Sequence, residues 1–161
     1  VDKIGLEMHQ AFCVYNTETL LRLREAVGPE IGANLDPSHL IWQGMDPIAV
    51  IRKLGSEAIF HVHAKDTKID AANTAVNGVL DAKSYADEIH RSWIFRSIGY
   101  GHDELFWKDF VSNLRLVGYD YVLSIEHEDS LLSKNEGLVK AVDVLKRAIP
   151  FEDKMTSMRW I

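Results

Sequence analysis

Residues 58–66 read AIFHVHAKD, and this stretch decides how the fold is interpreted. Apolar and polar residues alternate along it, as in a β-strand with one buried face. Two histidines, a lysine and an aspartate gather at its end. Two interpretations are open at this point: a strand that ends in a metal site, or a core strand followed by a polar turn.

Three further runs are predicted to be strands, and a helical pattern follows each of the four. The strands are residues 3–9, 31–36, 58–63 and 121–127, and the helices are residues 16–28, 45–55, 102–118 and 133–149. Residue types that begin helices stand at the start of these patterns, and glycine or proline stands at or just beyond their ends. Strand alternating with helix predicts βαβ units and a parallel sheet.

Each predicted strand has two faces, because successive side chains of a strand point in opposite directions. The first face is apolar and is expected to pack under helices: Ile4, Leu6, Met8, Ile31, Ala33, Leu35, Ala58, Phe60, Val62, Tyr121, Leu123 and Ile125. The second face is small or polar apart from Ile59 and Val122, and in every strand it ends with a group that can bind metal. A sheet covered by helices on both sides is apolar on both faces. The pattern therefore predicts a barrel of the α/β class, with helices outside and functional groups at the C-terminal strand ends.

Four of these groups share one face and one end of the predicted sheet: Glu7, Asp36, His63 and Glu126. Three neighbouring carboxylates repel one another, and a divalent cation removes that repulsion. We therefore predict that these side chains bind one metal ion. Three oxygen ligands and one imidazole suit Mn²⁺, Mg²⁺ or Co²⁺, whereas Zn²⁺ is less favoured because it usually takes more nitrogen or sulfur.

Two further histidines stand near the predicted ligands. His61 faces the same way as His63, and we expect it to support a ligand or to pack in the core rather than to bind metal. His39 comes three residues after Asp36. Either it reaches a substrate hydroxyl, or it is exposed in a turn.

The connection from Thr67 to His102 is long, which is itself a functional hint. Within it, Arg96 either binds a hydroxyl or phosphate of a substrate or forms a surface salt bridge. Lys65 and Asp66 come just before this connection, and from the residues alone an ion pair or a turn is the favoured role for them.

Composition narrows the class of protein and its partners. A length of 161 residues suits one domain, and 47% hydrophobic with 26% charged residues is typical of a soluble globular protein. The net charge of −6 argues against a nucleic-acid partner, and no apolar run approaches the roughly 20 residues that span a membrane. The single cysteine, Cys13, agrees with a reducing cytosol, so we expect a cytoplasmic protein.

Five stretches, taken together, resemble one known family. LEMH, NLDPSH, FHVHAKD, GYGHDELFWKDF and LSIEHED occur in matching order and are similar to the sugar phosphate isomerase/epimerase family, the xylose isomerase-like TIM barrels. The resemblance implies that the four predicted metal ligands are the ligands of the family, and that His39 and Arg96 contact the substrate. We place Lys65 with them as a third substrate-binding residue.

The resemblance implies proton transfer beside the carbonyl of a sugar or sugar phosphate. Glu7 and Glu126 would be the catalytic pair. One removes a proton, and the other returns it on the opposite face in epimerisation or at the neighbouring carbon in isomerisation. The metal would polarise the substrate oxygens and stabilise an enediolate. We therefore expect an isomerase or epimerase that acts on a ketose or a related sugar.

The chain departs from the family in size. A (β/α)₈ barrel takes about 250 residues, whereas this chain supplies about four βα units and resembles the second half of the family. We expect residues 1–161 to form a single half-barrel domain, either a fragment or a half that associates with itself or with another half. Two alternative functions stay open. One is a catalytically incomplete half barrel that serves as an assembly or binding module. The other is a related metal-dependent hydrolase, which would need more metal-binding histidines and a basic groove.

Overall fold

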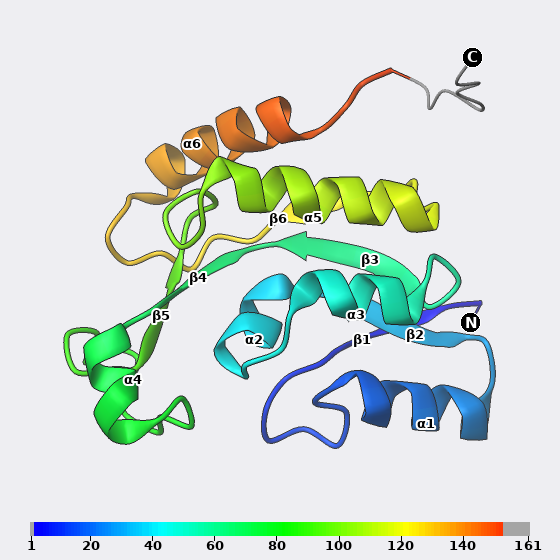
Figure 1. The fold of residues 1–161 in the computed structure, drawn as a ribbon, viewed down its shortest axis with the longest axis horizontal. Coiled ribbons are helices and arrows are strands. Elements are labelled where there is room, and N and C mark those ends of the chain that lie inside the picture. Colours follow the sequence, from blue (N-terminus) through cyan, green and yellow to red (C-terminus); the bar gives the residue numbers. More distant parts are fainter. Residues whose placement is uncertain (1, 153–161) are drawn as a thin grey trace, which may run out of the picture.

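The computed structural model describes residues 2–152, and these form two sheets and six helices (Figure 1). The strands are β1 (Ile4–Glu7), β2 (Ile31–Leu35), β3 (Ile59–Ala64), β4 (Asp66–Ile69), β5 (Trp93–Arg96) and β6 (Leu123–Ile125). The helices are α1 (Thr17–Val27), α2 (Pro37–Trp42), α3 (Pro47–Leu54), α4 (Ala71–Asn77), α5 (Glu104–Val117) and α6 (Lys134–Ala148).

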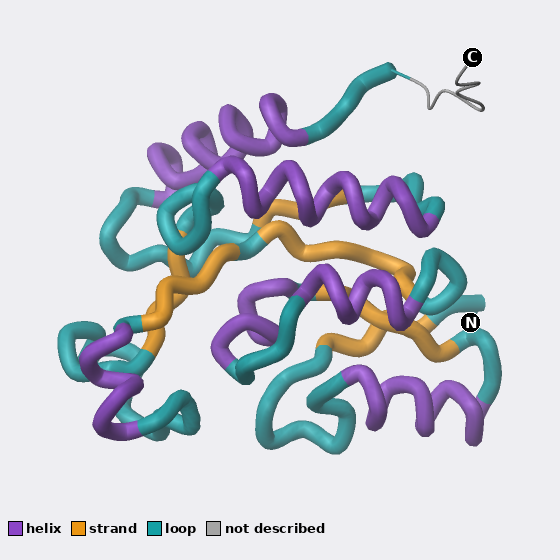
Figure 2. Tube along the Cα trace, viewed as in Figure 1, coloured by secondary structure: helices purple, strands orange, loops and turns teal. Residues whose placement is uncertain are grey.

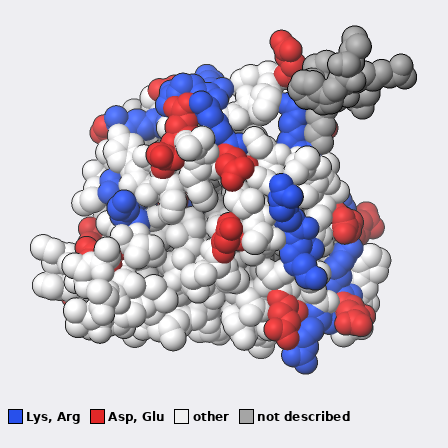
Figure 3. Space-filling model, viewed as in Figure 1, with Lys and Arg blue, Asp and Glu red and all other residues white. Residues whose placement is uncertain are grey.

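A four-stranded parallel sheet in the order β1-β2-β3-β6 organises the chain. Helices α1, α3, α5 and α6 lie side by side in that same order, each after its strand, as Figures 1 and 2 show. This arrangement confirms the four predicted βα units. Acidic and basic side chains are interspersed over the face drawn in Figure 3.

Polar side chains begin these four helices where the sequence predicts it. Oxygens of Asn16, Asp46, Asp103 and Ser133 accept hydrogen bonds from backbone N–H groups in the first turns of α1, α3, α5 and α6. Such caps satisfy donors that have no partner inside a helix. Gly118 follows α5 at a φ of 91°, a left-handed conformation that glycine adopts without strain.

The core lies between the parallel sheet and its helices. Trp107 and Phe110 of α5 are fully buried there, against apolar strand residues such as Val62. The opposite face of the sheet carries Asn34 and His61, which stay partly exposed. The two faces therefore differ in polarity, as the alternation predicts.

A register shift between β2 and β3 changes which side chains of β3 face the helices, compared with the prediction. Ala33 pairs with Ile59 but Asn34 pairs with His61, so β3 has one residue more than β2 between these pairs. Ile59 is consequently buried, whereas the Phe60 ring lies over Gly32, where an added Cβ would come within 2.5 Å of it. The prediction that Phe60 packs under the helices is wrong.

Tyr121 also departs from its predicted place on the apolar face. Its side chain is 71% exposed, and its ring stands edge-on to His61 on the open side of the sheet. Strand β6 begins only at Leu123, so the alternation that places Tyr121 under the helices does not extend to it.

Residues 66–97, called the arm below, form a structure that the sequence patterns do not predict. Strands β4 and β5 pair antiparallel, with Asp66 opposite Arg96 and Ile69 opposite Trp93, and α4 lies between them. Figure 1 shows the arm beyond the end of β3, apart from the four covering helices. Within residues 2–152, no helix has the length and apolar character to cross a membrane.

Candidate metal centre

The carboxyl ends of the four parallel strands bring the four predicted ligands together. Glu7 ends β1, Asp36 follows β2, His63 lies near the end of β3, and Glu126 follows β6. One ligand atom from each side chain lies within 4.8 Å of the other three. The spacing agrees with the sequence prediction, because parallel strands in register end at one edge of the sheet.

His63 is central in this cluster. Its Nδ1 lies 2.8 Å from Glu126 Oε2, 3.4 Å from Glu7 Oε1 and 3.8 Å from Asp36 Oδ2. Interaction with the Asp36 side chain raises the pKa of His63, and this effect outweighs burial, which alone would lower it. The imidazole therefore neutralises part of the negative charge of the cluster when it is protonated.

Three carboxylate oxygens in the cluster are buried and accept no hydrogen bond from the described residues. They are Glu7 Oε1, Asp36 Oδ2 and Glu126 Oε2, the same atoms that face His63. Buried oxygens without a donor are costly, and a cation would satisfy all three together. The donor set of three oxygens and one imidazole nitrogen therefore fits a divalent cation such as Mn²⁺, Mg²⁺ or Co²⁺.

The two carboxyl groups deepest in the cluster differ in their affinity for protons. Burial and the nearby charge of Asp36 raise the pKa of Glu7. Burial also acts to raise the pKa of Asp36, but the nearby His63 side chain and the charge of Lys65 outweigh it and lower that pKa to about 2. Asp36 therefore stays ionised near neutral pH, whereas Glu7 is the readier proton acceptor.

Lys65 supplies the positive charge nearest to these carboxylates. Its Nζ lies 3.1 Å from Asp36 Oδ2 and 3.2 Å from Glu126 Oε2, and it donates a hydrogen bond of 2.9 Å to Glu128 Oε2. The first two contacts are close ion contacts without hydrogen-bond geometry. Burial acts to lower the pKa of Lys65, but the charge of Asp36 and the bond to Glu128 outweigh it, so the net shift is upward.

His39 lies beside the cluster on α2, which begins at Asp36. Its Nε2 is 3.5 Å from Glu7 Oε1 and 3.6 Å from Asp36 Oδ2. Burial lowers the pKa of His39 to about 4, so the ring is neutral near neutral pH. The Trp42 indole donates to Nδ1, so Nε2 carries the hydrogen of the neutral ring. His39 is buried, in contrast to the exposed-turn interpretation.

Arg96 is the one predicted site residue that the structure does not place in this group. Its Nε donates to the buried Asp129 at 3.1 Å, and its guanidinium lies over the ring of Tyr100. The salt-bridge interpretation of Arg96 agrees with this contact. Asp129 also accepts hydrogen bonds from the N–H groups of Ser97 and Leu131.

Asp66 follows Lys65 but has a separate structural role. Its buried carboxylate accepts hydrogen bonds from the backbone N–H groups of Gly99, Gly101 and His102. His102 Nδ1 lies 2.8 Å from the same carboxylate, and the Thr67 N–H and the Trp107 indole also donate to it. Asp66 thus holds the GYGH turn against the end of β3.

A cavity of about 590 Å³ opens over the cluster, between the strand ends and the arm. Glu7, His39, Lys65 and Glu126 line it on the side of the sheet. Sequence reasoning did not identify the arm residues that line the other side: Tyr85, Glu88, Arg91, Ile94 and Phe95. The only signal for them is the short apolar run WIF at residues 93–95, inside a segment that the patterns leave as a loop.

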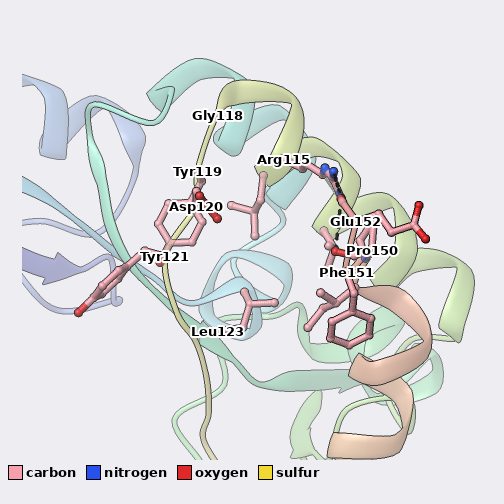
Figure 4. Close-up of a pocket in the computed structure, with 12 residues that line it drawn as sticks. Arg115, Gly118, Tyr119, Asp120, Tyr121, Leu123, Pro150, Phe151 and Glu152 are labelled. Carbon is pink, nitrogen blue, oxygen red and sulfur yellow. Dashed lines mark hydrogen bonds between the residues drawn. The ribbon is translucent and has the colours of Figure 1, made fainter. Parts of the chain in front are cut away.

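A second cavity of about 430 Å³ lies between the ends of α5 and α6, and Figure 4 shows its lining. Arg115 reaches across it and donates to the backbone oxygens of Pro150 and Glu152. None of the four clustered ligands lines this cavity.

Comparison with known proteins agrees with the fold. Residues 2–148 match the family described as xylose isomerase-like TIM barrel. The chain belongs to this family. Its four strands and their helices are therefore part of a TIM-barrel architecture, which confirms the predicted fold class.

Relatives in the family extend beyond the length of this chain. The Bacillus subtilis (strain 168) protein YfiH, described as uncharacterized, is 48% identical over 149 residues, which are 92% of this chain and 47% of YfiH. A xylose isomerase domain protein from Planctomyces limnophilus has a TM-score of 0.63 at 24% identity. The match covers 91% of this chain and 44% of the Planctomyces chain. The IolI protein, solved with a bound zinc atom, has a TM-score of 0.62 at 24% identity. The match covers 91% of this chain and 50% of the IolI chain. The chain thus spans about half the length of these relatives.

Proposed function

We propose that this chain carries the metal-binding and proton-transferring groups of a sugar or sugar phosphate isomerase or epimerase. One observation carries the proposal: four side chains converge at the strand ends, and three of their buried oxygens have no hydrogen-bond donor. The IolI protein, which shares the fold, has a bound zinc atom in its solved structure, and this supports a metal in the present chain.

Glu7 and Glu126 are the proposed acid–base pair. They come from β1 and from the end of β6, the two outer strands of the sheet, so their carboxylates approach the cavity from opposite sides. Burial raises the pKa of Glu7 and so makes its carboxylate a better proton acceptor. Glu126 would return the proton from the other side of the reacting carbon.

His39 and Lys65 are the proposed substrate-binding groups. Both line the cavity, and each offers an N–H donor: Nε2–H of the neutral His39 ring and the Lys65 ammonium. Donors in these positions can hold the hydroxyl and carbonyl oxygens of a sugar. A divalent cation held by the cluster would polarise the carbonyl and the adjacent hydroxyl and so stabilise an enediolate. Arg96 has no role in this proposal because Asp129 engages it outside the cavity lining.

The proposal is tested by metal binding and by proton exchange, measured separately. Mn²⁺ is titrated into the metal-stripped chain and the free ion is followed by electron paramagnetic resonance. D-Fructose, D-xylulose and D-tagatose are then incubated with the loaded chain in D₂O, and deuterium next to the carbonyl is read by NMR. We expect one Mn²⁺ per chain and exchange on one or more sugars. Glu126→Gln should weaken Mn²⁺ binding by about tenfold or more and abolish exchange.

The matched control is Glu18→Gln, which changes an exposed carboxylate in the first turn of α1 and should leave both readouts unchanged. A chain that binds no Mn²⁺, Co²⁺ or Zn²⁺ would exclude the proposal. Binding without exchange on any of the three sugars would favour the alternative of a catalytically incomplete half barrel. The hydrolase alternative is less favoured because the cluster contains a single histidine.

A further inference from the structure

Arg91 is a buried charge in the wall of the cavity that the proposed reaction does not use. Only 2% of the residue is exposed, yet it lines the same cavity as Glu7 and Glu126. Its guanidinium lies 4.4 Å from the ring centroids of both Tyr85 and Trp93, whose rings stand edge to face with centroids 6.0 Å apart. Cation–π contacts with two rings hold the group in this corner of the wall.

The guanidinium has spare hydrogen-bonding capacity. Nε donates to the Trp93 carbonyl at 3.2 Å, and Nη1 donates to the Lys83 carbonyl. Three of its five N–H groups have no partner within residues 2–152. No carboxylate of these residues lies within 4 Å of it, although buried charges are usually paired.

An aromatic wall connects Arg91 to the carboxylate cluster. Phe95 lies over Lys65 Nζ at 4.5 Å, and the ring of Tyr85 stacks on Phe95 with centroids 6.1 Å apart. Tyr85 then covers Arg91. A substrate whose reacting carbons lie at the cluster would extend along this wall, and the cavity of about 590 Å³ has the volume of a small-molecule site.

We propose that Arg91 binds an anionic substituent, a phosphate or a carboxylate, at the end of the substrate remote from the reacting carbon. The planar guanidinium can offer two parallel N–H groups to either anion. The inference rests on the proposed function, which places the reacting end of the sugar at the cluster. It adds that the remote end of the substrate carries an anionic group.

Glu88 is the opposing charge on this part of the wall. Its carboxylate lines the cavity and accepts a hydrogen bond from the Ser130 hydroxyl, and no cation of the described residues lies within 4 Å of it. Glu128, in contrast, is neutralised by Lys65. Repulsion from Glu88 therefore weakens anion binding, and its removal should strengthen it.

The test is equilibrium binding of anions to the metal-free chain, followed by calorimetry and by the fluorescence of its tryptophans. The probes are inorganic phosphate, D-fructose 6-phosphate and D-glucuronate, with D-fructose as the uncharged comparison. We expect saturable binding of inorganic phosphate and of at least one charged sugar, tighter than that of D-fructose. Arg91→Lys, which keeps the charge but not the paired N–H groups, should weaken it about tenfold or more. Glu88→Gln should tighten it.

Arg52→Gln is the matched control, because Arg52 contacts Asn113 on the helix side of the molecule. It should bind phosphate as the unchanged chain does. A far-ultraviolet spectrum and a melting curve establish that each variant is folded. If Arg91→Lys is unfolded, phosphate binding by Glu88→Gln becomes the deciding measurement. Unchanged or weaker phosphate binding by Glu88→Gln then overturns the proposal.

Unchanged phosphate affinity in folded Arg91→Lys would also overturn it, as would failure of the unchanged chain to bind any of the three anions. Preference for D-fructose 6-phosphate or for D-glucuronate would identify the group. Because these titrations need neither metal nor turnover, their failure leaves the proton-exchange result standing. Conversely, a chain without proton exchange can still bind phosphate at Arg91.

Discussion

Lys65 shows how a single side chain stabilises a cluster that would otherwise repel itself. Its ammonium is buried with Asp36, and both lie within 4 Å of other ionisable groups of the site. In the metal-free chain we expect Lys65→Met to lower the free energy of unfolding by about 3 kcal/mol, because it leaves buried carboxylates without their counter-charge. Urea denaturation at pH 7 measures the loss.

A saturating concentration of Mn²⁺ should reduce this loss, since the cation supplies the missing positive charge. Lys108→Met is the control, because Lys108 pairs with Glu104 on the exposed side of α5. Lys108→Met should lower the free energy of unfolding by less than about 1 kcal/mol. Equal losses in the two variants would contradict the role of Lys65.

The sequence predicts the residues of the cluster better than those of the cavity wall. Glu7, His63 and Glu126 are found by strand alternation because each strand ends at the same edge of the sheet. Arg91 and Phe95 cannot be found in this way, because their places depend on how the arm folds back over the sheet. Arg96 and Arg91 stand in the same connection, and only the structure shows which of them lines the cavity.

Helix α6 packs closely against the loop after β6, and this close packing requires the glycine at position 137. A Cβ on Gly137 would come within 2.2 Å of the His127 ring. Glycine to alanine inside a helix usually stabilises by about 1 kcal/mol. Here we expect the opposite sign, with Gly137→Ala lowering the free energy of unfolding by about 1–3 kcal/mol because the ring must move.

A double-variant cycle checks this explanation. His127→Ala removes the ring, so Gly137→Ala introduced into that background should cost less than it does alone. Both free energies come from urea denaturation. A cost that is the same in the two backgrounds would show that His127 is not the obstacle.

The arm is fastened to the loop after β6 by Asp129. Burial acts to raise the pKa of Asp129, but hydrogen bonds from the N–H groups of Ser97 and Leu131 and from Arg96 outweigh it, so the pKa is lowered in the folded chain. A carboxyl group of this kind stabilises the fold above its unfolded pKa of about 4. That contribution is lost as the pH falls through the folded pKa.

Asp129→Asn should therefore lower the free energy of unfolding by about 1.5–3 kcal/mol at pH 7, the size of a hydrogen bond to a charged group. The difference in free energy of unfolding between Asp129→Asn and the unchanged chain should narrow steadily as the pH is lowered from 5 to 3. Urea denaturation at each pH measures it. Asp143→Asn, a change at an exposed position of α6, is expected to show no such dependence. A difference that stays constant over this range would argue against the charge of Asp129.

Elements with strong periodic patterns are predicted from the sequence, and short or irregular ones are not. Helix α5 has a cap, an apolar stripe and a terminal glycine, and it appears where expected. Strands β4 and β5 lie in a connection whose sequence shows no apolar/polar alternation, and α4 buries no residue at all. Likewise, no pattern within β3 reveals the register shift, since it arises from pairing with β2.

At the scale of the whole molecule, the parallel sheet has two outer strands. In the described residues, β1 pairs only with β2 and β6 pairs only with β3. Outer strands with free N–H and C=O groups are templates for further pairing. We propose that the isolated chain associates through these edges, as expected for half of a barrel.

Sedimentation velocity over a range of concentrations should show species larger than the monomer. Val122→Lys, which places a charge beside β6, should shift the distribution toward the monomer. Val76→Lys, at an apolar position on α4 that is more exposed than Val122 (82% against 43%), serves as the control. A chain that is monomeric at every concentration would contradict association through the edges.

Asp36 has two oxygens with different neighbours: Oδ1 accepts from the Ser38 N–H at the start of α2, and Oδ2 faces the carboxylate cluster. A cation that attracts Oδ2 also restrains the turn from which His39 projects. Loading the site should therefore slow hydrogen exchange at the Ser38 amide, at a point where the backbone itself touches no ligand. The first turn of a six-residue helix would in this way report whether the neighbouring ion is present.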